Sequence, residues 1–413
     1  MIEGIGVRPS GVSGPRGQTT TVTRRGFLSL AVATPAAAIL GSSTASARPW
    51  LSSQDAAHWT LRIDRSALRP VQRSQLSGAF AWQEIGDGEF VSTGPVSTES
   101  FGLVAVSWPS EMPSSRVPRV LLRTRASWGW SEWHALQPDT HGPDEATAEA
   151  QRDRAASHPR IVEQSDVFEL VLAAEDVPAG LDVHFVQAGD GAFSTGAAAV
   201  QPADPAQPTI LTRADWGADE TIREPGDPDY GQIRGAFVHH TAGLNSYSAG
   251  DVPAIIRSIY VYHVRTRGWR DIGYNFLIDK FGRIWEGRYG GISQPVVGAH
   301  TAGYNSSSFG AAVIGTYSSK VPEQAVLRAY RRLIAWKFSL HAVQPLTLVS
   351  YPDQDRLPAI SGHRDTSATE CPGQQLYDAL PSLRREVNLA IKPGSRRTLV
   401  SPIGPQPVIP PTD

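Results

Sequence analysis

The chain has 413 residues, with 38 basic and 40 acidic side chains and a formal net charge of −2. This length suits two domains better than one, and the near-neutral balance excludes the basic surface of a nucleic-acid-binding protein. Hydrophobic residues make up 40% and charged residues 19% of the chain, which excludes global disorder and, with no long apolar run beyond the N-terminus, a polytopic membrane protein.

The first 47 residues have the features of an export signal. The pair Arg24-Arg25 precedes an Ala-rich apolar stretch, 26–40, that is too short to cross a bilayer comfortably. Small residues at 45–47 then provide a cleavage site, so the mature chain is expected to begin at Arg48. We therefore predict that residues 1–47 are a twin-arginine signal peptide. The mature protein would lie in the cell wall or outside the cell, without an integral membrane segment.

Residues 48–198 have the pattern of an all-β domain. Short apolar runs separated by turn-rich pieces predict strands, and they lie at 102–106, 120–124, 168–172 and 181–186. Such a series predicts a sandwich-like fold, with wall targeting or simple spacing as its role. The polar stretch 143–159 is expected to form a long excursion or a short exposed helix.

A Pro-rich polar linker, 199–209, leads to a second domain, 210–393, in which strands and helices alternate. The apolar patterns predict strands at 235–239, 274–279, 283–286, 309–315 and 359–361, and helices that begin at 253, at 322 and near 376. We therefore expect a mixed central sheet flanked by helices, which makes the fold class α/β behind an all-β domain. Residues 394–413 are expected to be a Pro-rich tail.

Three polar residues of the second domain suggest a metal site. His239 and His363 each follow a predicted buried strand, and functional groups in open α/β sheets gather at the carboxyl ends of strands. Cys371 is the only cysteine, so it excludes an intramolecular disulfide, and a metal would protect an exported thiol from oxidation. Two imidazoles and a thiolate would leave one tetrahedral zinc position open for water. The spacing alone is not specific, and without the surrounding residues it favours a buried cysteine and two core histidines over a metal site.

Five ordered segments, which together cover roughly 211–387, resemble the peptidoglycan recognition protein and type-2 N-acetylmuramoyl-L-alanine amidase family. The segments are 213–218 (RADWGA), 237–242 (FVHHTA), 268–278 with 282–288 (GWRDIGYNFLI, GRIWEGR), 298–305 (GAHTAGYN) and 362–365 with 371–373 (GHRD, CPG). The resemblance implies the fold of that family, one zinc ion per chain, and the muropeptides of peptidoglycan as the partner.

The same resemblance implies roles for individual residues. The zinc ligands would be His239, His363 and Cys371. The catalytic residues would be Tyr274 and Thr369, which border the oxyanion as hydrogen-bond donors. The residues facing the muropeptide would be His300, Arg288, Asn305 and His263.

The activity implied by the resemblance is a secreted, zinc-dependent N-acetylmuramoyl-L-alanine amidase, which hydrolyses the amide between the lactyl group of MurNAc and L-Ala of the stem peptide. Either Tyr274 or Glu286 could carry the proton, and the sequence does not decide between them. Tyr289-Gly290 replaces the family's Gly-Trp pair beside Arg288, so the preference for diaminopimelate or lysine stem peptides stays open.

Two other functions remain as alternatives. Non-catalytic members of the family typically lack the cysteine or the tyrosine, and this chain has both, which favours an enzyme over a protein that only binds peptidoglycan. A cysteine hydrolase that uses Cys371 with His363 is the second alternative, and it should survive removal of metal.

Overall fold

The computed structural model describes residues 57–72, 74, 88–109, 117–189, 206–351 and 356–391. The predicted signal peptide (1–47), the predicted tail (394–413) and the predicted linker up to residue 205 lie outside these residues. Within the described residues, no helix has both the length and the apolar character needed to cross a membrane.

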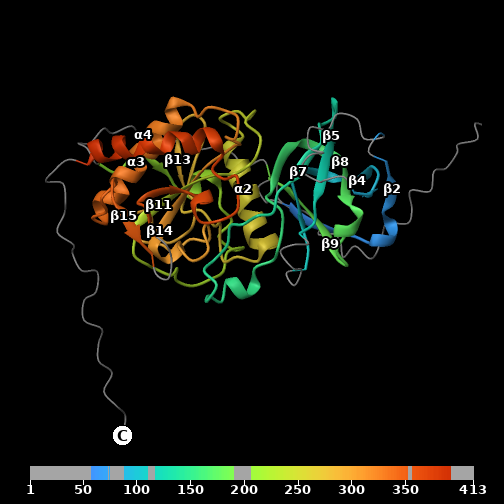
Figure 1. Ribbon diagram of the computed structural model, residues 1–413, viewed down its shortest axis with the longest axis horizontal. Helices are drawn as coiled ribbons and strands as arrows, with labels where there is room; N and C mark the ends of the chain where they lie inside the picture. The colour runs from blue at the N-terminus through green and yellow to red at the C-terminus, as the bar shows by residue number, and fades with distance from the viewer. Residues whose placement is uncertain are drawn as a thin grey trace, which may run out of the picture. The chain divides into compact units, whose positions relative to one another are not determined.

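The first domain is all-β, as predicted, and its described strands form one nine-stranded antiparallel sheet (Figure 1). The long strand β8 is its centre, with β4, β9 and β1 following in order on one side, β3 and β2 on the other, and β5, β6 and β7 completing the pairing. The strands are β1 (Ala57–Ile63), β2 (Arg69–Val71), β3 (Phe90–Ser92), β4 (Val96–Ser107), β5 (Val120–Ala126), β6 (Gly129–Trp130), β7 (His134–Leu136), β8 (Arg160–Ala173) and β9 (Leu181–Gln187).

This sheet bends around its own core, as a sandwich-like domain requires. Leu122 on β5 and Phe185 on β9 belong to one buried cluster, although β8 and β4 lie between their strands in the sheet. The opposite face of β4 and β9 is buried too, because Leu103 and Val186 share a cluster with Val252 of the second domain. Both faces of these two strands are therefore apolar, which explains their nearly continuous hydrophobic sequence.

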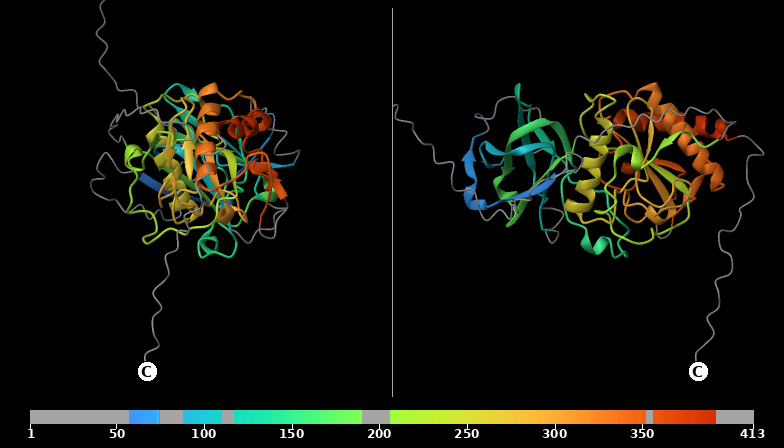
Figure 2. Two further views of the ribbon diagram at one scale, coloured as in Figure 1. Left: turned by 90° about the vertical axis from the view of Figure 1, so that its left-hand side faces the viewer. Right: turned by 180° about the vertical axis from the view of Figure 1, so that it is seen from behind.

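The second domain has a mixed six-stranded sheet with helices on both faces (Figures 1 and 2). The strand order is β10-β13-β12-β14-β11-β17, and every pair is parallel except β12 with β13. The strands are β10 (Ile210–Leu211), β11 (Gly235–His240), β12 (Phe276–Ile278), β13 (Ile284–Glu286), β14 (Ser308–Val313) and β17 (Ile360–Gly362), and the helices are α2 (Val252–Val261), α3 (Gln324–Leu340) and α4 (Gln374–Ala390).

Alternation along β14 shows how the layers form. Val313 packs with α3 and α4, whereas Ala312 packs with α2 on the opposite face. The predicted α/β fold class is thereby confirmed, together with the strands and helices expected for this domain.

Three local features differ from the sequence predictions. Helix α3 begins at Gln324 with Glu323 as its N-cap, so Pro322 precedes the helix instead of occupying its first position. Helix α2 continues into η7, a π-helix over Tyr262–Arg267. The small sheet of β15 (Leu348–Ser350) and β16 (Arg356–Pro358) was not predicted, because strands of three residues carry too little periodicity to be recognised.

The stretch predicted as an excursion or an exposed helix is an excursion. Residues 137–159 join β7 to β8 and contain a single 3-10 turn, η4 (Ala150–Arg152). Expecting an exposed helix there was wrong, because Glu149 and the run 141–143 are buried. We call residues 137–159 the covering segment.

Tyr330 connects α3 to the strands that carry the candidate site. Its buried hydroxyl lies 3.0 Å from the carbonyl oxygen of His239 and 3.1 Å from that of Ala311. Because both acceptors are buried, Tyr330→Phe is expected to lower the free energy of unfolding by about 1–2 kcal/mol, measured as a lower urea midpoint. Tyr230→Phe, which removes an exposed hydroxyl, should leave that midpoint unchanged. Equal midpoints for the two variants would contradict the expectation.

Candidate metal centre

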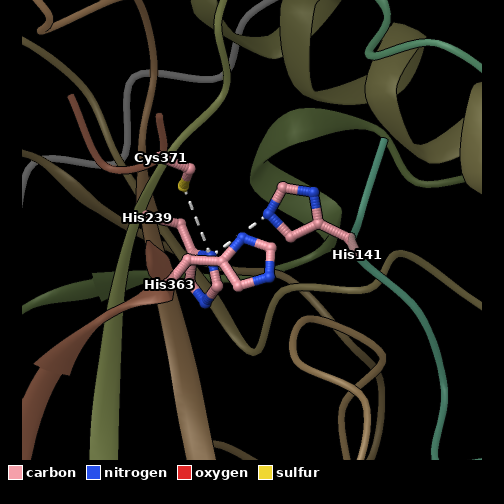
Figure 3. A group of neighbouring side chains, drawn as sticks. All are labelled: His141, His239, His363 and Cys371. Carbon is pink, nitrogen blue, oxygen red and sulfur yellow. Dashed lines mark hydrogen bonds between the residues drawn. The ribbon is translucent and has the colours of Figure 1, made fainter. Parts of the chain in front are cut away.

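Four metal-binding side chains from distant parts of the sequence meet at the carboxyl ends of β11 and β17 (Figure 3). His239 lies near the end of β11, and His363 follows β17 at the start of the turn η9 (His363–Asp365). Cys371 lies eight residues further along the chain, and His141 comes from the covering segment. One ligand atom of each residue lies within 4.8 Å of all the others, and all four residues are buried.

The structure therefore brings together the three predicted ligands and places a fourth side chain, His141, beside them. His239 Nδ1 lies 3.6 Å from Cys371 Sγ and 3.1 Å from His141 Nε2. The rings of His141 and His363 stack with their centroids 4.4 Å apart. Both ring nitrogens of His363 are buried without a hydrogen-bond partner among the described residues. Such nitrogens are costly to bury, and a metal ion at the centre of the group would provide the missing partner.

The electrostatics of the group fit a bound cation. Burial, reinforced by the neighbouring imidazoles, holds the pKa values of His239 and His363 well below their usual range. Both imidazoles are therefore neutral and can offer a lone pair. Burial also raises the pKa of the Cys371 thiol, so its thiolate needs a positive partner. Imidazole nitrogens with one thiolate are the donors that zinc prefers in a tetrahedral site.

A buried carboxylate orients His141. Asp139 Oδ1 lies 2.6 Å from His141 Nδ1, and its other oxygen lies 2.6 Å from Arg267 Nη1. Although burial opposes ionisation, the guanidinium of Arg267 holds the pKa of Asp139 well below its usual range. An ionised carboxylate only accepts hydrogen bonds, so Nδ1 of His141 donates to Asp139 and Nε2 is the ring nitrogen that faces the group.

The two predicted catalytic residues lie beside this group. The Tyr274 hydroxyl is 3.5 Å from His141 Nε2, and burial raises the pKa of Tyr274 well above its usual range, so the hydroxyl keeps its proton. Thr369 Oγ1 accepts a hydrogen bond of 3.2 Å from the backbone N–H of Cys371, and Thr369 lines a cavity of about 550 Å³. Glu286, the other possible proton carrier, accepts from the backbone N–H of Arg213 at 3.4 Å.

The four residues predicted to face the muropeptide are all buried. His300 Nδ1 lies 3.2 Å from His239 Nε2, so this ring lies behind a ligand. His263 stacks on Trp269 with the ring centroids 4.5 Å apart. Arg288 and Asn305 both contact the covering segment. A role for these four residues in substrate binding stays a prediction.

Sequence reasoning missed His141. The signal available was a histidine two residues after an aspartate, at Asp139-Thr140-His141, in a stretch too polar for a core. Nothing in its spacing connects it to ligands almost a hundred residues away, since that proximity arises only from tertiary structure.

Comparisons with known proteins give a family for each of the two domains. Residues 229–374 match a family described as N-acetylmuramoyl-L-alanine amidase, and residues 63–209 match one described as Rv3811 N-terminal galactose-binding domain-like. The chain is 31% identical over 172 residues to peptidoglycan-recognition protein SC2 of Drosophila melanogaster, in a match that covers 42% of this chain and 84% of that protein.

Two further matches have a similar extent on this chain. An N-acetylmuramoyl-L-alanine amidase of Sus scrofa is 34% identical over 193 residues, which cover 46% of this chain but only 29% of that longer protein. The solved structure of Drosophila PGRP-LB is 32% identical and covers 42% of this chain and 93% of its own, with a TM-score of 0.35.

Proposed function

Because the chain belongs to the family of N-acetylmuramoyl-L-alanine amidases and peptidoglycan-recognition proteins, we propose that it is a zinc-dependent amidase of peptidoglycan. Its reaction would be hydrolysis of the amide between the lactyl group of MurNAc and the L-Ala of the stem peptide. The observation that supports catalysis is the buried group of His239, His363 and Cys371 with the Tyr274 hydroxyl beside it. A protein that only binds muropeptides has no need of this group.

His239, His363 and Cys371 would hold the zinc ion. When bound, zinc supplies a Lewis acid for the scissile carbonyl and lowers the pKa of the attacking water toward about 7. Tyr274 keeps its proton at neutral pH and can donate it as a hydrogen bond to the carbonyl oxygen as negative charge develops there. Thr369, next to Cys371 on the wall of the cavity, is the second candidate donor.

Burial of Cys371 favours the metal role over the thiol-hydrolase alternative. A nucleophilic cysteine needs a lowered pKa and partial exposure, whereas burial raises the pKa of this thiol.

We also propose export by the twin-arginine route to the cell wall, which the pair Arg24-Arg25 and the apolar stretch after it support.

Digestion of purified peptidoglycan by residues 48–413 tests the proposed function. From the wild type or from His141→Ala, we expect release of stem peptides that begin with a free L-Ala amine, loss of this release on zinc chelation, and its recovery when zinc is added back. The products are identified by mass spectrometry. The assay includes His141→Ala, because the His141 ring lies within the metal group.

Two outcomes would contradict the proposal. Unchanged release in the presence of chelator would support the thiol hydrolase instead. Sedimentation of zinc-loaded protein with peptidoglycan, without cleavage by the wild type or by His141→Ala, would show a binding protein.

A further inference from the structure

The covering segment closes the metal group from outside the second domain. In Figure 3 His141 extends from this segment, drawn in teal, toward His239 and His363. Its side chain is about 1% exposed and is fixed on both sides: Nδ1 faces Asp139, and the backbone carbonyl accepts a 2.9 Å hydrogen bond from Arg267. A histidine held this firmly, with Nε2 facing His239, His363 and Cys371, has the arrangement of a metal ligand.

His141 changes the number of protein ligands available to the metal from three to four. His239, His363 and Cys371 leave one tetrahedral position, and a catalytic zinc site keeps that position for water or substrate. His141 Nε2 lies 3.1 Å from His239 Nδ1 and belongs to the same set of mutually close ligand atoms. With His141 the set has four protein ligands, which is the composition of a closed site.

The same segment also accepts hydrogen bonds from the N–H donors of residues 303–306. One oxygen of Asp144 accepts from the backbone N–H groups of Gly303 (2.8 Å) and Asn305 (3.2 Å), and the other accepts from that of Ser306 (3.1 Å). The carbonyl oxygen of Gly142 accepts from the side-chain amide of Asn305 at 2.9 Å. A carboxylate on three converging N–H groups occupies an anion site.

Glu149 occupies a second anion site. Its carboxylate pairs with Arg288 and accepts a 2.9 Å hydrogen bond from the backbone N–H of Arg270. Both side chains of the Glu149–Arg288 pair are less than a tenth exposed. A buried guanidinium must have an anionic partner, and in this structure the chain itself provides the anion.

Little space remains beneath the segment. The cavity lined by Asp144, Glu149 and Arg288 has a volume of about 40 Å³. That is room for a few water molecules only, because about 10–15 Å³ of such space holds one water. A sugar linked to a peptide could not enter beside Arg288 while the segment is in place, although a separate cavity of about 550 Å³ borders Pro138, His158 and Thr369.

We propose that His141 is a fourth ligand of the metal, and that the covering segment holds the enzyme latent by lying where a ligand with carboxylate groups would bind. The proposed latency rests on the proposed amidase function. The assignment of His141 as a metal ligand does not depend on that function. Activity then requires the segment to leave, which exposes one metal position, Arg288 and the N–H groups of 303–306 together.

Ligand counting by X-ray absorption at the zinc edge tests the coordination. Zinc-loaded residues 48–413 should show three imidazoles and one sulfur, and His141→Ala should show two imidazoles, one sulfur and an oxygen. We also expect His141→Ala to weaken zinc binding by about 10-fold or more, measured by competition with a coloured chelator. His158→Ala, on the same segment, should leave the imidazole count at three. Two imidazoles in the wild type, or equal counts in the wild type and His141→Ala, would overturn the proposal.

A second variant tests the covering role while it keeps His141. Glu149→Gln removes the carboxylate charge that pairs with Arg288, and we expect chelator to extract zinc faster by about 10- to 100-fold, the effect of one buried hydrogen bond to a charged group. Glu145→Gln, four residues earlier and exposed, is the matched control and should behave as the wild type. Equal extraction rates from both variants would overturn the covering role, and so would peptidoglycan cleavage by the wild type as fast as by Glu149→Gln.

The two proposals fail separately. If zinc-loaded wild type, His141→Ala and Glu149→Gln all leave peptidoglycan intact, the amidase function is wrong, and the imidazole count still decides the role of His141. If His141→Ala cleaves peptidoglycan no faster than the wild type and has the same zinc ligands, latency is wrong and the amidase function stands.

Discussion

Cys371→Ala is expected to abolish zinc retention and peptidoglycan hydrolysis together. The thiolate is the only anionic donor in the group of His141, His239, His363 and Cys371. Zinc binding to four-ligand structural sites amounts to about 10–16 kcal/mol. Loss of one ligand in four should therefore cost roughly 3 kcal/mol or more, which is about 100-fold or more in affinity. Zinc content after dialysis and stem-peptide release measure the two effects.

Cys371→Ser is the companion variant, since it nearly preserves the size of the side chain. A serine hydroxyl gives up its proton far less readily than a thiol, so this variant should also lose zinc. Circular dichroism must show that both variants fold, because Cys371 is about 1% exposed and packs inside the domain. Zinc affinity like that of the wild type in folded Cys371→Ser would contradict the ligand assignment.

The sequence predicts those residues of the site that lie at the ends of regular strands. His239 lies near the end of the buried parallel strand β11 and His363 directly follows β17, and each strand is recognisable from a short apolar run. Parallel strands bring their carboxyl ends to one edge of the sheet. The proximity of the two histidines follows from topology, and the resemblance of the local motifs added Cys371 and Tyr274.

His141 could not be predicted because its contacts depend on how a long loop folds back. The segment has one 3-10 turn and no periodicity, and polar residues make its sequence typical of an exposed linker. Asp139 and Glu149 are buried only because Arg267 and Arg288 meet them, and those arginines lie more than a hundred positions away. The same long-range pairing explains why Arg288 and Asn305, expected to face substrate, are covered.

The covering segment also gives the first domain a role that neither wall targeting nor spacing describes. Three of its acidic residues, Asp139, Asp144 and Glu149, contact Arg267, backbone N–H groups and Arg288 of the second domain. These contacts pair charge with charge at buried positions, where removal of one partner is costly. The two domains should therefore unfold as a unit for as long as the segment is in place.

Tyr274→Phe is expected to lower the rate of hydrolysis by about 10²–10³-fold, the usual effect of losing one donor to an oxyanion. Because the hydroxyl is 3.5 Å from His141 Nε2 and is not among the ligand atoms, zinc content should not change. The effect should appear in kcat, since a donor that acts on developing charge contributes little to ground-state binding. The measurement is steady-state release of L-Ala-terminated peptides.

Because the covering segment is proposed to hold the enzyme latent, the rate of Tyr274→Phe must be compared with that of a parent protein in the same state. Tyr274→Phe is best measured against its parent in the His141→Ala background, where the segment no longer supplies a ligand and both proteins share the same remaining closure, so that a difference in rate reports chemistry. Tyr230→Phe, an exposed tyrosine, is the matched control and should keep the parent rate. A zinc-loaded Tyr274→Phe variant within about threefold of its parent would remove the hydroxyl from the reaction, because a lost oxyanion donor costs at least about 10²-fold. Thr369 would then be the donor to replace next, since it is the other predicted one.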